Sequence, residues 1–112
     1  MPTYTIKNRY TGHVIYTGSA DTRKAFLKAI PAGTNLTEAD LKGDDLSRVQ
    51  WAAMNLTRAD LRDTDLTDAK FPSTTLTDGD IMNAKVTRTN FVTSTTTRLN
   101  TSGTKGSGHK GL

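Results

Sequence analysis

The sequence contains no cysteine, so a disulfide framework, a thiolate metal site and a thiol nucleophile are all excluded. Aromatic residues make up only 6% of it and hydrophobic residues 34%, which is little for a globular core of ordinary design. No apolar run is long enough to span a membrane, and the first residues, MPTYTIKNRY, lack the apolar segment of a secretory signal. With 112 residues, we expect one small cytoplasmic domain that uses a few apolar positions repeatedly.

Acidic residues are scarce at both ends of the chain. Residues 1–33 hold five bases and one acid, and residues 94–112 hold three bases and no acid. The middle, 34–93, holds seven bases and ten acids, so the net charge of +4 comes from the ends. We therefore do not interpret the whole chain as a nucleic-acid binder.

The apolar residues that are present recur at every fifth position. This period matches neither the 3.6 residues of a helix nor the 2.0 residues of a strand, so it indicates a repeat architecture. Every one of twelve successive steps ends on an apolar residue: Leu36, Leu41, Leu46, Trp51, Leu56, Leu61, Leu66, Phe71, Leu76, Ile81, Val86 and Phe91.

A second period of twenty lies on top of the first. When the twelve residues are arranged in fours, the three aromatic ones, Trp51, Phe71 and Phe91, fall in a single column. Four five-residue steps with an inward side chain at each step would close one square coil. The sequence therefore predicts about three coils over residues 34–93, with the twelve residues as the core ladder.

The segments ADLKG (39–43), ADLRD (59–63) and MNLTR (54–58) are close copies of the motif A(D/N)LXX. On this motif the chain resembles the pentapeptide-repeat proteins. The resemblance implies an all-β solenoid, a right-handed quadrilateral β-helix in which the central residue and the residue two before it point inward.

Residues 1–33 predict a β-hairpin followed by a helix. Apolar and polar residues alternate over 4–6 and 14–16, with a turn at 9–12. Asp21 is the expected N-cap of the helix, whose apolar face we expect to cover the first coil with Ala25, Phe26, Ala29 and Ile30. This segment looks like the amino-terminal cap of some bacterial and phage members of the family.

Residues 94–112 are rich in Ser, Thr, Gly and Lys and predict a flexible tail. A flexible tail would leave the third coil uncapped. We therefore expect homo-oligomers that form through the C-terminal coil.

Two surfaces are candidates for partner contact. On one side of the solenoid, Ala52, Pro72 and Val92 lie among residues that carry a single charge, Lys70. Such a flat, nearly uncharged side is typical of a protein contact surface, although an ordinary surface is the alternative. On another side, Asp40, Asp60 and Asp80 stack as an acidic stripe, which is either simply solvated or a site for a cation or a basic partner.

The sequence favours no catalytic, cofactor-binding or metal-binding residue. The two histidines, His13 and His109, lie far apart in a hairpin and in the tail. The tail segment GTKGSGHK fails as a phosphate-binding loop, because His109 and Lys110 stand where Lys and Ser or Thr are needed. A filled solenoid also offers no concave active site.

These patterns predict a non-enzymatic protein-interaction or structural module that binds an unidentified protein or a second copy of itself. The likeness to phage members implies an origin in a phage or mobile element and, in that case, a place in the virion. The alternative implied by the resemblance is a DNA-mimicking modulator of DNA gyrase or topoisomerase. Binding of nucleic acid by the tail would rest on Arg98, Lys105 and Lys110 alone, so we do not expect it, nor a membrane partner.

Overall fold

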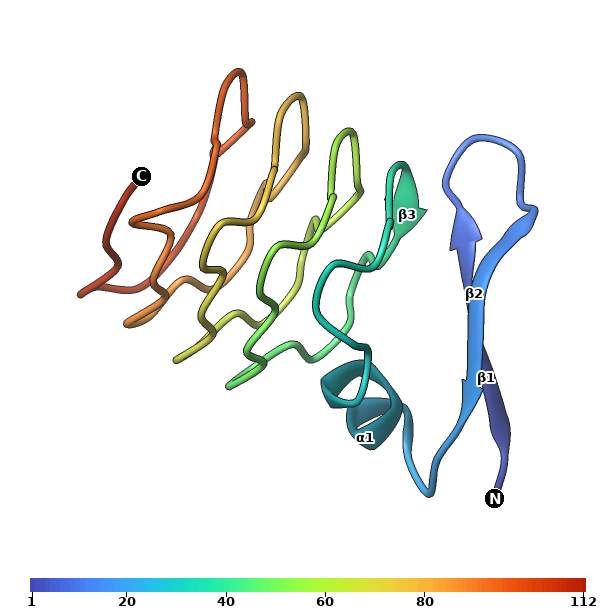
Figure 1. The fold of residues 1–112 in the computed structure, drawn as a ribbon. Coiled ribbons are helices and arrows are strands. Elements are labelled where there is room, and N and C mark those ends of the chain that lie inside the picture. Colours follow the sequence, from blue (N-terminus) through green and yellow to red (C-terminus); the bar gives the residue numbers. More distant parts are fainter.

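The computed structural model describes residues 1–112 and contains few regular elements. Strand β1 (Thr3–Asn8) and strand β2 (Val14–Ser19) form an antiparallel hairpin, and helix α1 (Arg23–Lys28) follows. Strand β3 (Ala39–Asp40) belongs to the first of the stacked coils that make up the remainder of the chain (Figure 1).

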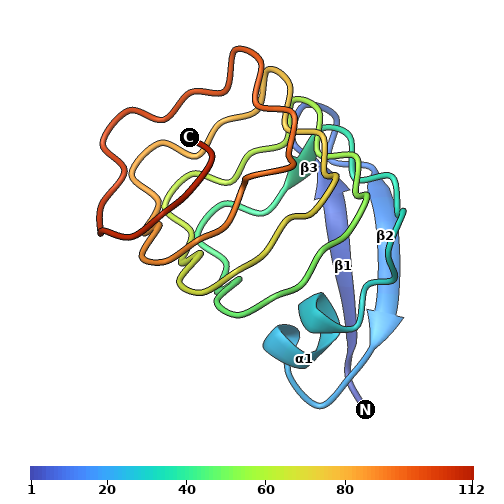
Figure 2. The ribbon, with the colours of Figure 1, turned by 60° about the vertical axis from the view of Figure 1, so that its left-hand side comes forward.

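The stacked coils are joined by parallel β-bridges between residues that are twenty positions apart. One column of bridges runs from Asn35 through Asn55 and Thr75 to Thr95, and three further columns repeat this pattern. In each column, backbone hydrogen bonds connect neighbouring coils, as from Leu36 N–H to the Asn55 carbonyl at 2.8 Å. Four coils therefore stack on one another (Figures 1 and 2).

Residues 94–112 form a fourth coil, so the prediction of a flexible tail was wrong. Lys110 N–H donates to the Thr89 carbonyl at 2.9 Å, and Phe91 N–H donates to the Lys110 carbonyl at 2.8 Å. These bonds need no apolar side chain, which is why a composition that is poor in apolar residues still continues the stack. The third coil is consequently covered, and Leu76 and Phe91 are at most 1% exposed.

Each side of a coil ends in a tight turn. At the first corner, Ala39 N–H donates to the Leu36 carbonyl at 3.0 Å, and Glu38 between them has a φ of 61°. A four-residue turn with a positive φ at its third residue is a type II turn. The same left-handed residue recurs at five-residue intervals, and eleven non-glycine residues of the chain adopt it.

The twelve predicted ladder residues all lie in the core, each at most 1% exposed. The aromatic column is also confirmed. The rings of Trp51 and Phe71 meet edge to face with centroids 6.3 Å apart, and those of Phe71 and Phe91 stack at 5.3 Å.

Strand β1 of the hairpin pairs with β3 of the first coil, so the hairpin adds two strands to one side of the stack in the order β2-β1-β3. Lys7 lies opposite Asp40 in this pairing. Helix α1 lies across the end of the first coil (Figure 1), where Trp51 Nε1 donates to the Leu27 carbonyl at 3.0 Å. The helix differs from its prediction in two details. Thr22 rather than Asp21 is the N-cap, because its hydroxyl accepts from Ala25 N–H.

The second detail is the buried face of the helix. Phe26, Leu27 and Ile30 are buried, whereas Ala25 and Ala29 are exposed. Since α1 has only six residues, one turn of side chains is enough to cover the end of the coil.

Candidate interaction surface

The predicted contact side lies directly outside the aromatic column, and we call it the Pro72 face. Each coil contributes three outward residues to it, because the buried aromatic ring of that coil fixes which of its neighbours point away from the core. Its members in the first three coils are Gln50, Ala52, Ala53, Lys70, Pro72, Ser73, Asn90, Val92 and Thr93.

Apolar side chains form an exposed row along the Pro72 face. Pro72 is exposed, Ala52 is half-buried, and Val92 is 60% exposed, which makes it one of the most exposed large apolar residues in the chain. The structure thus places Ala52, Pro72 and Val92 side by side on successive coils, as the period of twenty predicts.

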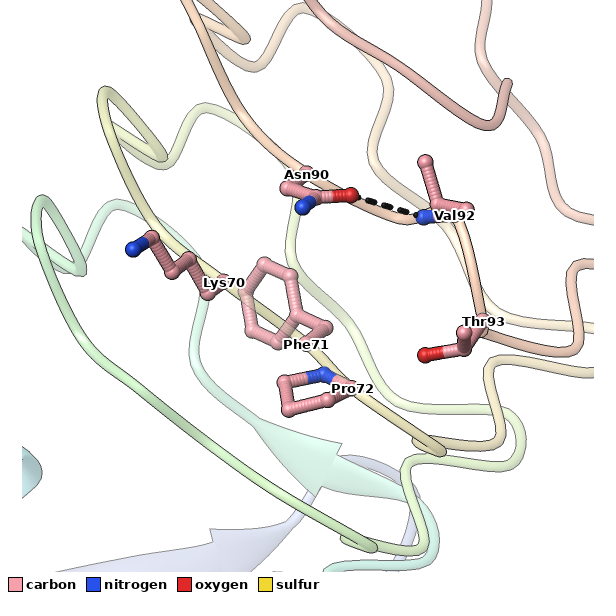
Figure 3. Close-up of a pocket in the computed structure, with 6 residues that line it drawn as sticks. All are labelled: Lys70, Phe71, Pro72, Asn90, Val92 and Thr93. Atoms are coloured by element: carbon pink, nitrogen blue, oxygen red, sulfur yellow. Dashed lines mark hydrogen bonds between the residues drawn. The ribbon is translucent and has the colours of Figure 1, made fainter.

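The Pro72 face is hollowed between the second and third coils. Figure 3 shows the hollow, of about 290 Å³, with Lys70, Phe71 and Pro72 on one coil and Asn90, Val92 and Thr93 on the next. Asn90 Oδ1 accepts from Val92 N–H at 2.9 Å, which fixes the backbone of its upper rim. Because Phe71 itself is 1% exposed, most of the wall that a ligand would touch comes from Pro72 and Val92.

A second hollow, of about 300 Å³, adjoins the first and was missed by the sequence reasoning. None of its lining residues is of an apolar type, so we call it the polar hollow, and it shares Lys70 and Asn90 with the apolar hollow. Its remaining lining residues are Arg88, Thr89, Gly108 and Lys110. Extending the period of twenty to Lys110 would have found it, but the composition of residues 94–112 predicts a tail.

The acidic stripe is not the uniformly solvated surface that the sequence predicts. Asp40 is exposed and Asp80 is half-buried, but Asp60 between them is only 4% exposed. Arg62 covers Asp60 with two hydrogen bonds of 2.8 Å, and Arg9 from the hairpin lies 3.9 Å away. Burial alone would raise the pKa of Asp60, but the hydrogen bonds from Arg62 lower it below its usual value.

Asp60 is therefore charged and already paired, whereas Asp40 is exposed and forms no ion pair. Arg62 also reaches toward Asp80, at 4.0 Å. Asp60 therefore offers no free carboxylate to a cation or a basic partner on this side.

Two further sides carry ion pairs between coils, as the alternating charges predict. Arg58 donates to Glu38 at 2.9 Å, and Arg88 donates to Asp68 at 2.7 and 3.0 Å. The hydrogen bonds from Arg88 hold the pKa of Asp68 below its usual value. Each arginine binds the carboxylate one coil earlier, so these charged groups are already paired within the fold.

Asp44, a carboxylate at an inward position of the first coil, is paired with the helix. Arg23 of α1 donates two hydrogen bonds to it, at 2.7 and 3.0 Å. The neighbouring Lys24 binds Asp45 at 3.0 Å and also donates to the Ser47 carbonyl. These contacts join α1 to one corner of the first coil.

No group of three or more histidine, aspartate or glutamate side chains is placed to hold a metal ion. The chain also has no helix with the length and apolarity that a bilayer span requires.

Comparison with known proteins identifies the repeat. The family model for pentapeptide repeats matches residues 55–92 in eight copies. These residues are pentapeptide repeats. The resemblance seen in the sequence is thereby confirmed over these residues, which are about a third of the chain.

Among solved structures, the chain is similar to the crystal structure of Rfr23, a pentapeptide repeat protein from the cyanobacterium Cyanothece 51142. The identity is 19% over 70% of this chain and 60% of that chain, with a TM-score of 0.38. The match thus spans less than two thirds of Rfr23. A comparison with curated proteins found no match.

Proposed function

We propose that this pentapeptide-repeat chain is a non-enzymatic interaction module that binds a protein partner through the Pro72 face. The observation that carries the proposal is the exposed row of Pro72 and Val92 beside a hollow of about 290 Å³. On other sides, Arg58, Arg88 and Arg98 form ion pairs with carboxylates one coil earlier. The Pro72 face instead offers apolar area and has no ion pair of its own.

The chain offers a matched pair of variants to test the proposal. Val92 and Met82 occupy the same position of the five-residue repeat in the third coil, but on different sides. Val92→Gln should abolish capture of the partner from an extract of the source organism, whereas Met82→Gln should retain it. If both variants capture the same proteins as the wild type, the Pro72 face is not the contact surface.

A second copy of the chain is the other binding partner that the sequence predicts. The expected contact was an open third coil, but the fourth coil covers it, so the uncapped end of the stack lies one coil further along the chain. Sedimentation velocity of the wild type and Val92→Gln distinguishes the two occupants. A dimer that dissociates on Val92→Gln would assign the face to self-association.

DNA mimicry toward DNA gyrase is the second function implied by the family, and the charge distribution does not support it. A mimic of duplex DNA needs a continuous acidic surface, whereas residues 81–112 contain five bases and no acid. A supercoiling assay tests this, and dose-dependent inhibition or protection of gyrase would reverse the ranking. The phage origin and the cytoplasmic or virion location stay predictions from the sequence.

A further inference from the structure

We propose that the partner segment on the Pro72 face is an extended acidic peptide, which places an apolar side chain against Pro72 and Val92 and carboxylates against Lys70 and Lys110. This inference rests on the proposed function and assigns the chemistry of the partner. It comes from the polar hollow that adjoins the apolar one.

The polar hollow is lined by three cationic side chains and no apolar one. Lys70, Arg88 and Lys110 come from the second, third and fourth coils, so the hollow exists only because residues 94–112 continue the stack. Asn90 adds a neutral hydrogen-bonding group, whereas the Thr89 hydroxyl is buried and donates to the Leu66 carbonyl at 2.6 Å. Such a lining suits a carboxylate, which accepts hydrogen bonds at both oxygens.

The lysines of this region have no carboxylate partner within the chain. Arg88 is paired with Asp68, but neither Lys70 nor Lys110 forms an ion pair. On the adjoining side, Lys85 lies directly opposite Lys105 across one β-bridge and opposite Asp65 across the next, and it forms no ion pair. Like charges directly opposite each other are destabilising, so the fold keeps a positive surface that an acidic partner would neutralise and that would speed its association.

The two hollows together match the dimensions of an extended peptide that lies along the stack. Lys70 and Lys110 are two coils apart, which is roughly 10 Å at the strand spacing of about 4.8 Å. An extended chain rises about 3.4 Å per residue and alternate side chains face the same way, so two carboxylates four residues apart, with an apolar residue midway between them, would face the protein together over roughly 14 Å, within reach of the flexible lysine side chains. An apolar residue between them would lie beside Pro72 and Val92.

An unbiased selection tests the proposed chemistry. A displayed library of random twelve-residue peptides is selected on the wild-type protein, and the best binders are synthesised with a fluorescein label for anisotropy. We expect enrichment of Asp and Glu on both sides of an apolar residue. Binding should weaken at least tenfold in Lys70→Glu and in Lys110→Glu, and should weaken as salt is raised.

The matched control is Lys42→Glu, a change of the same charge at an exposed lysine on another side of the solenoid that also forms no ion pair. It should alter the dissociation constant less than twofold. Thermal unfolding followed by circular dichroism verifies that each variant is folded.

The remaining outcomes separate this inference from the proposed function. Selected peptides that lack acidic residues but lose binding in Val92→Gln would overturn the acidic chemistry and leave the contact face in place. Peptides that bind Val92→Gln and Lys70→Glu as tightly as the wild type would overturn both. A selection without enrichment, or tighter binding of a labelled single-stranded oligonucleotide than of any peptide, would overturn the acidic-peptide inference alone.

Discussion

Left-handed backbone at non-glycine residues is the most regular source of strain in this solenoid. Eleven such residues have a φ between 52° and 62°. A side chain in this conformation costs roughly 1 to 2 kcal/mol, and glycine avoids that cost. The repeat tolerates the cost at most corners because the hydrogen bonds between coils hold the turn in place.

Ala53→Gly is therefore expected to stabilise the protein. Ala53 has a φ of 55°, its side chain is exposed, and its N–H bond to the Pro72 carbonyl at 2.8 Å survives the change. Relief of the strain should exceed the extra entropy of glycine by about 0.5 to 1 kcal/mol, a rise of a few degrees in the unfolding midpoint.

The control for Ala53→Gly is Ala52→Gly, because Ala52 is the preceding residue and does not have a positive φ. This change relieves no backbone strain, so it should lower the free energy of unfolding by about 0.5 to 1 kcal/mol. Urea unfolding of both variants measures the difference. Equal destabilisation by the two changes would show that the corner is not strained.

At the scale of a single residue, we also expect the stability of the fold to depend on the ionisation of Asp45. Burial acts to raise the pKa of its carboxyl, but hydrogen bonds from Ser47 and Lys24 outweigh burial and lower the pKa to about 2. Since this lies below the unfolded value of about 4, Asp45 stabilises the fold above pH ~4, and the effect is lost as the pH falls toward ~2. The carboxylate side chain is 60% exposed, so screening limits the effect to less than about 1 kcal/mol.

A carbon-detected NMR titration of Asp45 should show a midpoint near 2, and Ser47→Ala should move it upward. A wild-type midpoint at or above about 4, the value of an unperturbed aspartate, would contradict the hydrogen-bonded arrangement.

At the scale of elements, the docking of α1 depends on a charged pair as well as on apolar contact. Asp44 is an inward carboxylate with a side chain 14% exposed, and Arg23 is its ion-pair partner. Arg23→Met should destabilise the protein by about 1 to 3 kcal/mol, because it leaves a largely buried charge without a partner. Adding Asp44→Asn to that variant should recover part of the loss.

A double-mutant cycle over Arg23 and Asp44, measured by urea unfolding, gives the coupling energy. We expect at least about 0.5 kcal/mol, the lower bound for residues in direct contact. Additive effects of the two changes would mean that the helix docks through Phe26 and Leu27 alone.

The elements of residues 1–33 were predictable in kind but not in detail. Alternation places β1 and β2 well, because a half-buried strand must alternate. The N-cap was misplaced by one residue, since Asp21 and Thr22 are both good caps and only the position of the chain on the first coil decides between them. Leu27 is 1% exposed but was missed, and its carbonyl accepts from Trp51 Nε1, a contact over 24 residues that local periodicity does not show.

At the scale of the whole molecule, the ladder was predictable because one register governs every coil. Any slip would move all twelve apolar residues out of the core together, so the pattern is strongly specified. The Pro72 face follows from the same register. The burial of Asp60 was not predictable, because it depends on Arg9 from the hairpin, which the register does not place.

The composition of residues 94–112 does not predict the fourth coil, because backbone hydrogen bonds between coils do not require particular side chains. Its inward positions hold Thr96, Thr101, Gly106 and Gly111, none of which is buried. Leu99, two positions before Thr101, is partly buried and packs against the core, but most of the stability of this coil comes from backbone pairing with the coil before it.

Hydrogen exchange tests this account of the fourth coil, because its amides alternate between bonded and free. Asn100, Lys105 and Lys110 donate to carbonyls of the third coil at 2.9 to 3.0 Å, whereas the amides of Thr96 and Thr101 have no backbone acceptor. We expect the three bonded amides to exchange at least tenfold more slowly than in an unstructured peptide, an opening free energy of about 1.4 kcal/mol or more, and the two free amides to exchange nearly unprotected. Protection should be greater at the equivalent amides of the second coil, where apolar side chains are buried. Uniformly fast exchange from Thr96 to Lys110 would show that these residues are a tail after all, and the cationic hollow at Lys110 would be lost with the coil.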